Sequence, residues 1–179
     1  MTSEAILKRL QSYHSADLDS PDFPETDILF ILGCIDVPDL EIRTMAMSLV
    51  ADFSEPVIEN VLTLFPSFKK SIQKQLIMHL MTSSLMLPYQ FLFNYLMTLN
   101  DEHMVNFIIT CLSQTQFELF PMILGRLDSD DMRYISRLKQ LLRAIGFNRI
   151  ELYLKIMPQI PFEQYFRDVF GGDKIDQLK

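Results

Sequence analysis

The chain contains few of the residues on which several fold and function classes depend. Of its 179 residues only 5 are glycine, 3 are histidine and 2 are cysteine. All-β folds and phosphate-binding folds use glycine for turns and for close backbone approach, so this composition argues against both classes. Leu, Met, Ile and Phe dominate while Val is scarce, which favours helices over strands.

The cysteines and histidines are too scattered to indicate a disulfide framework or a metal site. Cys34 and Cys111 each lie in an apolar run, where a free cysteine behaves as a small hydrophobic residue. His14, His79 and His103 include no pair four residues apart, which a helical zinc site requires. The first residues do not form the basic and apolar blocks of a signal peptide. We therefore expect no metal, no cofactor and a reducing, cytoplasmic setting.

Positive charge is also in short supply. The net charge is −7, with 12 acidic and 3 basic residues in 1–60 but 8 acidic and 10 basic residues in 126–179. Phosphate affinity comes from Lys and Arg, so a general nucleic-acid binder is disfavoured. An acidic first third and a mildly basic last third indicate surfaces that attract different neighbours, or a scatter of solvated charge without a role.

An acidic segment without a basic residue lies near the N-terminus. Its carboxylates are Asp17, Asp19, Asp22, Glu25 and Asp27. They suggest a site for a cation or for a basic partner. A calcium loop needs a tighter ligand pattern and usually a glycine at its turn, so the metal hypothesis is the weaker one.

One long stretch carries no formal charge. It is QLIMHLMTSSLMLPYQFLFNYLMTLN, residues 75–100, with 16 apolar residues but never more than three in a row. A membrane helix needs about 20 consecutive, mostly apolar residues, and Pro88 after two serines marks a break. We therefore predict two helices and no membrane contact. The absence of charge indicates that both helices are buried between neighbouring helical repeats, which are described below.

Apolar residues recur at helical spacing along most of the chain. We expect Ser3 to cap a first helix that ends near Ser15, and a loop at 16–27. Further helices are predicted at 25–34, 39–51, 55–65, 68–83, 88–99, 101–114, 117–127, 130–146, 148–157 and 161–170. Asn100 and Ser129 are the expected N-caps of two of them.

Short connections between these helices recur every 28 to 34 residues. They lie at 36–38, 66–67, 100–101, 128–130 and 158–161. Such a period is typical of stacked helical hairpins, because one hairpin cannot bury its own apolar face. We therefore predict an all-α, right-handed α-solenoid of about five antiparallel hairpins with an N-terminal capping helix. The predicted parts are a cap with its acidic loop, a repeat domain and a tail, at residues 1–24, 25–170 and 171–179.

Two segments resemble the second helix of a HEAT repeat. That motif has an Asp in the turn, an apolar residue followed by Arg, a small residue three positions later, and then Leu. In DVPDLEIRTMAMSLV these are Asp36, Ile42, Arg43, Ala46 and Leu49. DSDDMRYISRLKQLLRAIG repeats the pattern more loosely, with Met132, Arg133 and Ser136. The short period looks more like the compact HEAT-like repeats of the phycobilisome-lyase type than like longer HEAT units, which implies an α-solenoid over about 25–170.

Five basic residues are the candidate partner-binding side chains. On the helix at 130–146, Arg133 and Arg137 project together, and Lys139 and Arg143 project together on the other flank, opposite the apolar stripe. They form either an ordinary solvated face or a basic groove for an acidic partner. Arg43, from the HEAT-like segment, completes the set.

No catalytic constellation stands out in the sequence. Gly171 and Gly172 follow a helical run and indicate a helix end, since a phosphate loop has a different pattern. We therefore expect no enzyme, and our leading hypothesis is a non-catalytic protein–protein interaction module or scaffold. One alternative is a chaperone- or lyase-like maturation factor that binds a pigment or an apolar ligand. A purely structural subunit and a DNA-binding HEAT-like protein are further alternatives, the latter disfavoured by the acidic net charge.

Overall fold

The computed structural model describes the chain except for residues 14, 83–85, 115–122, 124–129, 157–162 and 173–179. The described residues form helices and no strands, so the all-α prediction is confirmed. The chain divides into two compact units, Met1–Pro88 and Tyr89–Lys179. Within the described ranges, no helix is both long enough and apolar enough to cross a membrane.

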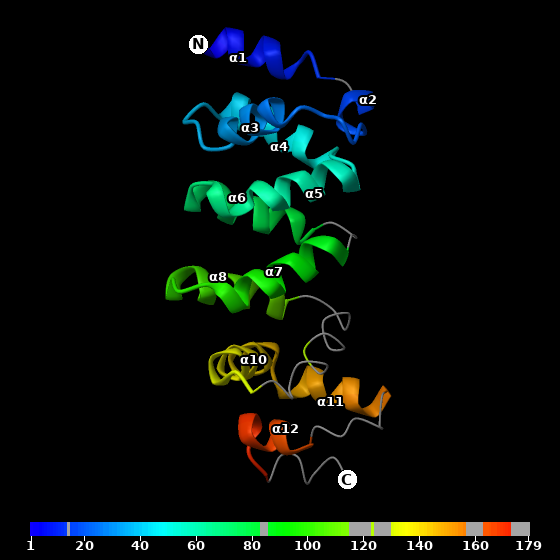
Figure 1. Cartoon of the computed structure of the whole chain (residues 1–179), viewed down its shortest axis with the longest axis vertical. Helices are drawn as coiled ribbons and strands as arrows, with labels where there is room; N and C mark the ends of the chain where they lie inside the picture. Colours follow the sequence, from blue (N-terminus) through cyan, green and yellow to red (C-terminus); the bar gives the residue numbers. More distant parts are fainter. Residues whose placement is uncertain (14, 83–85, 115–122, 124–129, 157–162, 173–179) are drawn as a thin grey trace. The chain divides into compact units, whose positions relative to one another are not determined.

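The first unit is built around the helices near the N-terminus. Its elements are α1 (Ser3–Leu10), α2 (Ser15–Leu18), α3 (Glu25–Cys34), α4 (Leu40–Ala51), α5 (Glu55–Leu64), the 3-10 turn η1 (Phe65–Ser67) and α6 (Lys70–Leu80). Both α1 and α3 pack against α4 (Figure 1). The core of this unit includes Ile28, Ile31 and Val57, none of which has measurable exposure. Burial of these apolar faces is the main stabilising contribution.

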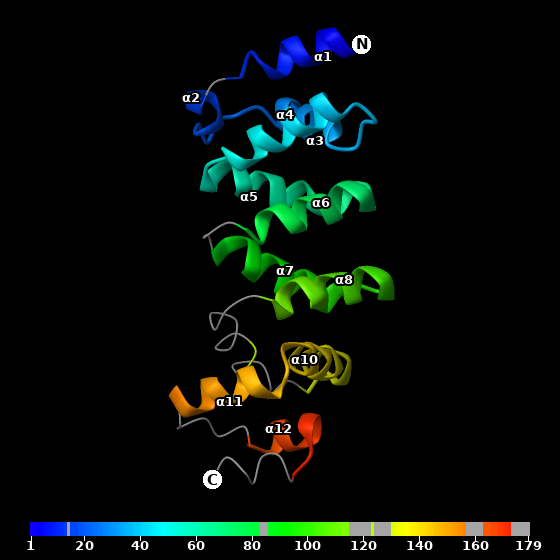
Figure 2. The ribbon, with the colours of Figure 1, turned by 180° about the vertical axis from the view of Figure 1, so that it is seen from behind.

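The second unit is organised around one long amphipathic helix. Its elements are α7 (Met86–Thr98, whose first three residues belong to the first unit), α8 (Glu102–Ser113), α10 (Met132–Ile145), α11 (Phe147–Ile156) and α12 (Glu163–Phe170). Helix α10 packs against α8 on one side and against α11 and α12 (Figure 2). It buries Leu138, Leu141 and Leu142, as its apolar spacing predicts.

The N-terminal helix is shorter than predicted. Thr2, not Ser3, is its N-cap and accepts a hydrogen bond from the Ala5 backbone N–H at 3.4 Å, and the helix ends at Leu10 rather than near residue 15. A second short helix, α2, lies where a loop was expected. Leu18 at its end is 1% exposed, and its carbonyl accepts a hydrogen bond from the Ser54 backbone N–H. Tertiary burial therefore orders this polar segment, which local sequence alone does not predict.

Three helices begin with the same aspartate cap. Asp39, Asp101 and Asp131 each accept hydrogen bonds from the backbone N–H groups two and three residues further on. The prediction that Asn100 caps α8 is wrong by one residue, and α10 is capped by Asp131, whereas Ser129 lies outside the described residues. A carboxylate at this position satisfies the same donors as Asn or Ser and also interacts favourably with the helix dipole.

The remaining helices follow the prediction within a few residues. Helix α3 has the predicted bounds, whereas the helix expected at 117–127 falls almost wholly outside the described residues. The uncharged stretch is divided between α6 and α7, as predicted. Within α7, Phe93 is completely buried, while Tyr89 and Tyr95 remain partly exposed.

Candidate functional site

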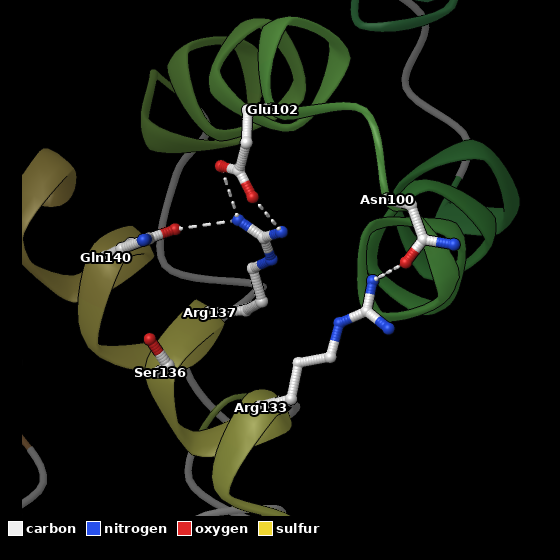
Figure 3. Close-up of a pocket in the computed structure, with 6 residues that line it drawn as sticks. All are labelled: Asn100, Glu102, Arg133, Ser136, Arg137 and Gln140. Atoms are coloured by element: carbon white, nitrogen blue, oxygen red, sulfur yellow. Dashed lines mark hydrogen bonds and ion pairs between the residues drawn. The ribbon is translucent and has the colours of Figure 1, made fainter.

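A polar recess of about 400 Å³ lies between α8 and α10 in the second unit (Figure 3). It is lined by Asn100, Glu102, Arg133, Ser136, Arg137 and Gln140. Two of these residues flank the N-cap of α8, and four come from the first three turns of α10. The recess therefore combines two arginines with one carboxylate and several neutral hydrogen-bonding groups.

Arg137 and Glu102 form a bidentate ion pair on one wall of the recess. The Arg137 Nη2 donates to Glu102 Oε1 at 2.7 Å and its Nη1 donates to Oε2 at 3.1 Å. The same Nη1 also donates to Gln140 Oε1 at 3.3 Å, as Figure 3 shows. These hydrogen bonds from Arg137 lower the pKa of Glu102, so this carboxylate stays ionised at neutral pH. The positive charge of Arg137 is neutralised within the protein.

Arg133 is held in a different way. It is exposed, and its Nη2 donates to the backbone carbonyl of Leu99 and to Asn100 Oδ1, the latter at 2.5 Å. Leu99 directly follows the last residue of α7, whose final turn contains no basic residue. Arg133 thus donates a hydrogen bond at the carboxyl end of α7, where carbonyl groups lack donors within the helix. Both of its acceptors are neutral groups.

The five basic residues predicted from the sequence have different environments. Arg133 and Arg137 lie together in the recess, as their spacing predicts, but Arg137 is only 6% exposed and does not lie on a solvated face. Its burial is possible because Glu102 satisfies its charge and its donors. Lys139 is half-buried and pairs with Asp168 at 3.3 Å, Arg143 is exposed, and Arg43 lies partly exposed in the first unit. A role of these residues in partner binding stays a prediction.

Four residues of the recess were not identified from the sequence. They are Asn100, Glu102, Ser136 and Gln140. Glu102 and Arg137 are 35 residues apart, close to the period of the helical connections. A search for opposite charges about one period apart would therefore have paired these two residues. Ser136 and Gln140 each lie three residues after one of the two arginines, and Asn100 lies 33 residues before Arg133.

A second, shallower hollow lies along α4 in the first unit. Its volume is about 590 Å³ and its lining residues are Leu40, Glu41, Thr44, Met45 and Ser48. All five come from one face of one helix, and Leu40 is 68% exposed. This hollow is therefore a partly apolar helix face and not an enclosed chamber for a pigment.

The acidic segment near the N-terminus takes part in a structural network. Asp27 Oδ1 accepts hydrogen bonds from Arg9 Nη2 at 2.7 Å and from the Tyr13 hydroxyl at 2.6 Å. Arg9 also lies 3.8 Å from the centre of the Phe30 ring. Among the described residues, no group of three or more His, Cys, Asp and Glu side chains has metal-binding geometry. Asp27 therefore fastens α1 to α3.

Burial shifts the pKa values of two cysteine thiols and one histidine. Burial raises the pKa of the Cys34 and Cys111 thiols, so both remain protonated and poorly nucleophilic. Burial lowers the pKa of His79, which keeps this imidazole neutral. None of the three lines the recess between α8 and α10.

Comparison with known proteins identifies no relative: no family model matches the chain, and neither the curated proteins nor the solved structures contain a significant match.

Proposed function

We propose that this chain is a non-catalytic protein–protein interaction module built from HEAT-like helical hairpins, and that the recess between α8 and α10 contacts its partner. The proposal rests on the observation that the exposed Arg133 guanidinium donates hydrogen bonds to two neutral acceptors, while its charge acts on the Glu102 carboxylate only through space. Such a group at an exposed position suits recognition of an acidic partner. The chain itself, with a net charge of −7, does not supply a general nucleic-acid surface.

Side-chain contacts of the second unit support the repeat architecture. Arg133 donates to Leu99 and Asn100, at separations of 34 and 33 residues, and Arg137 pairs with Glu102 at a separation of 35. Arg149 donates to the Ser113 carbonyl at a separation of 36. In stacked hairpins each repeat contacts only its neighbours, so tertiary contacts concentrate at one repeat length. A common separation of 33 to 36 residues is what a HEAT-like solenoid of short repeats would produce.

The chemistry of the recess also favours binding over catalysis. Its single carboxylate has a lowered pKa, whereas a general acid or base needs a pKa near the working pH. Its one hydroxyl nucleophile, Ser136, shares the recess with arginines and amides and with no histidine. These groups donate hydrogen bonds and hold charge, which are the properties that a recognition surface uses.

The proposal is tested by capture of partners from a lysate of the native cells. The tagged chain serves as bait, and the eluted proteins are identified by mass spectrometry and re-purified with the chain by size-exclusion chromatography. We expect a protein with an acidic surface to co-elute in stoichiometric amounts, and Arg133→Glu to reduce its recovery. The matched control is Arg143→Glu, which reverses an exposed charge on the same helix outside the recess. Recovery of no stoichiometric partner would refute the proposed function.

A further inference from the structure

We infer that the recess between α8 and α10 binds a single carboxylate of an acidic partner segment, and that the side chain of Asn100 occupies the place of that carboxylate in the free protein. This inference rests on the proposed function and adds to it the chemical group that is recognised. It assigns different roles to the two arginines, which the sequence presents as equivalent members of one basic face.

The charge of the recess matches one carboxylate. Its lining includes two arginines and one glutamate, and the Arg137–Glu102 pair is internally neutral. The charges of the lining residues therefore sum to one positive charge, and Arg133, which hydrogen-bonds to neutral acceptors and acts on Glu102 only through space, can present it to a ligand. A carboxylate carries one negative charge, whereas a phosphorylated side chain carries about −1.5 to −2 at neutral pH. The second charge of a phosphate would meet no free cation in the recess and would be repelled by the exposed Glu102 carboxylate.

The hydrogen bonds of Arg133 indicate how a carboxylate enters. Its hydrogen bonds to Leu99 and Asn100 both come from Nη2, which belongs to both of the donor edges that can hold a carboxylate in bidentate fashion. A partner carboxylate must therefore replace one of the two acceptors. The Leu99 carbonyl is part of the backbone, but Asn100 contributes an exposed side chain that can rotate away. The exchange replaces one hydrogen bond to a neutral amide oxygen by two hydrogen bonds to an ionised carboxylate.

The neighbouring helix ends do not compete for the ligand. The backbone N–H groups of the second and third residues of α8 and of α10 already donate to the Asp101 and Asp131 carboxylates. Ser136 lies one turn beyond Arg133 on α10, is exposed and lines the same recess. Its hydroxyl can donate a second hydrogen bond to an acidic segment that runs along α10 from Arg133.

Substitutions of Asn100 give the inference a distinctive test. Asn100→Asp places a carboxylate on the chain itself at the position of the amide oxygen, so the protein would supply its own ligand. We expect this variant to melt at a higher temperature than the wild type and to bind acidic peptide at least about tenfold more weakly. Asn100→Ala removes the side-chain amide that accepts the Arg133 hydrogen bond in the free protein. We expect this variant to bind the peptide at least as tightly as the wild type. A purely structural Asn100 would change stability without this opposite effect on binding.

The binding probe is a fluorescein-labelled peptide of alternating glutamate and glycine, compared with the same peptide containing glutamine. Fluorescence anisotropy of the full chain should show saturable binding of the glutamate peptide only, weakening with salt. Arg133→Gln should weaken binding by about tenfold, while Arg143→Gln, the control on the same helix, should change it less than about twofold. The Arg133 Nε–H resonance should shift on binding of the peptide.

Three outcomes would overturn the inference: equal losses for Arg133→Gln and Arg143→Gln, unchanged binding by Asn100→Asp, or tighter binding of a phosphoserine–glycine peptide than of the glutamate peptide. Melting curves establish that each variant is folded. Should the chain capture a stoichiometric partner from the lysate yet bind glutamate and glutamine peptides equally, the carboxylate inference fails and the interaction function stands. Absence of a lysate partner would instead count against the proposed function itself.

Discussion

Arg137 of α10 and Glu102 of α8 form a bidentate ion pair in which the two partners differ sharply in exposure. The Arg137 side chain is 7% exposed, whereas the Glu102 side chain is 66% exposed. The guanidinium has thus lost its water and depends on Glu102 and Gln140 for its hydrogen bonds. The carboxylate has kept much of its water. Removal of either partner should therefore have unequal consequences.

Glu102→Gln should destabilise the second unit more than Arg137→Met does. The first change leaves a buried guanidinium without its counter-charge, while the second replaces it with an apolar side chain of similar length and returns Glu102 to solvent. We expect the melting temperature to fall by roughly 5 °C or more for Glu102→Gln and by less than half of that for Arg137→Met. Differential scanning calorimetry measures both. Lys139→Met, which breaks the more exposed pair with Asp168, is the control, and a larger loss for Arg137→Met would contradict the argument.

Helix ends in this protein are completed by side chains from later helices. Gln73 of α6 donates to the Phe65 carbonyl beyond the end of α5, and Arg149 of α11 donates to the Ser113 carbonyl at the end of α8. Arg133 of α10 likewise donates to the Leu99 carbonyl, just beyond the end of α7. The Leu99 and Ser113 carbonyls lie at helix ends, where carbonyl groups lack intrahelical donors. The Phe65 carbonyl accepts the Gln73 hydrogen bond in addition to one from the Phe68 backbone N–H. The ends of the helices are therefore stabilised through tertiary contacts as well as by local capping.

Substitution of Gln73 tests the contribution of one such contact. Gln73 is 4% exposed, and its Nε2 lies 2.9 Å from the Phe65 carbonyl oxygen. Gln73→Met keeps the length of the side chain and removes the donor, so we expect the free energy of unfolding to fall by about 1–2 kcal/mol. Urea denaturation of the variant measures this change. Gln75→Met on the same helix, at a half-exposed position, should stay within about 0.5 kcal/mol of the wild type. Equal losses of stability in the two variants would show that the hydrogen bond between Gln73 and Phe65 does not stabilise the protein.

Much of the secondary structure follows from the sequence, because apolar spacing is a local property. The bounds of α3 and the division of the uncharged stretch into α6 and α7 were predicted and are confirmed. Composition also sufficed for the all-helical class. Local spacing did not predict α2, because its order depends on burial of Leu18 and on a backbone contact with Ser54.

The recess was harder to predict than the helices. Spacing along α10 places Arg133 and Arg137 on adjacent turns, but it does not say which of them is buried. That difference arises because α8 brings Glu102 to Arg137, while the end of α7 brings neutral acceptors to Arg133. Both relationships depend on how helices pack across about one repeat length, which is information that a helical wheel does not contain. The candidate residues on α10 could be named from the sequence, and their partners could not.

Tyr13 should make the stability of the first unit fall at alkaline pH. Burial, together with its hydrogen bond to Asp27, raises the pKa of Tyr13 to about 12 from the ordinary value of 10.0. The folded state therefore holds the proton more tightly than the unfolded state. The stabilisation from Tyr13 is complete below about pH 10 and is lost as the pH rises toward 12. As the pH rises through this window, the free energy of unfolding of the wild type should fall relative to that of Tyr13→Phe. Urea denaturation of both proteins measures this change. Parallel curves would show that Tyr13 does not titrate as described.

Gly146 and Gly33 should respond in opposite directions to the same substitution. Gly146 ends α10 with φ +88° and ψ 150°, a conformation that only glycine adopts readily, although an added Cβ would meet no atom within 4 Å. Gly146→Ala should therefore cost about 1–3 kcal/mol through backbone strain alone. Gly33 lies exposed within α3, also with open space around it, and Gly33→Ala should stabilise the protein by a few tenths to about 1 kcal/mol. Chemical denaturation of the wild type and both variants measures the two changes in the free energy of unfolding. A loss of stability in Gly33→Ala equal to that in Gly146→Ala would show that the backbone conformation does not determine the response.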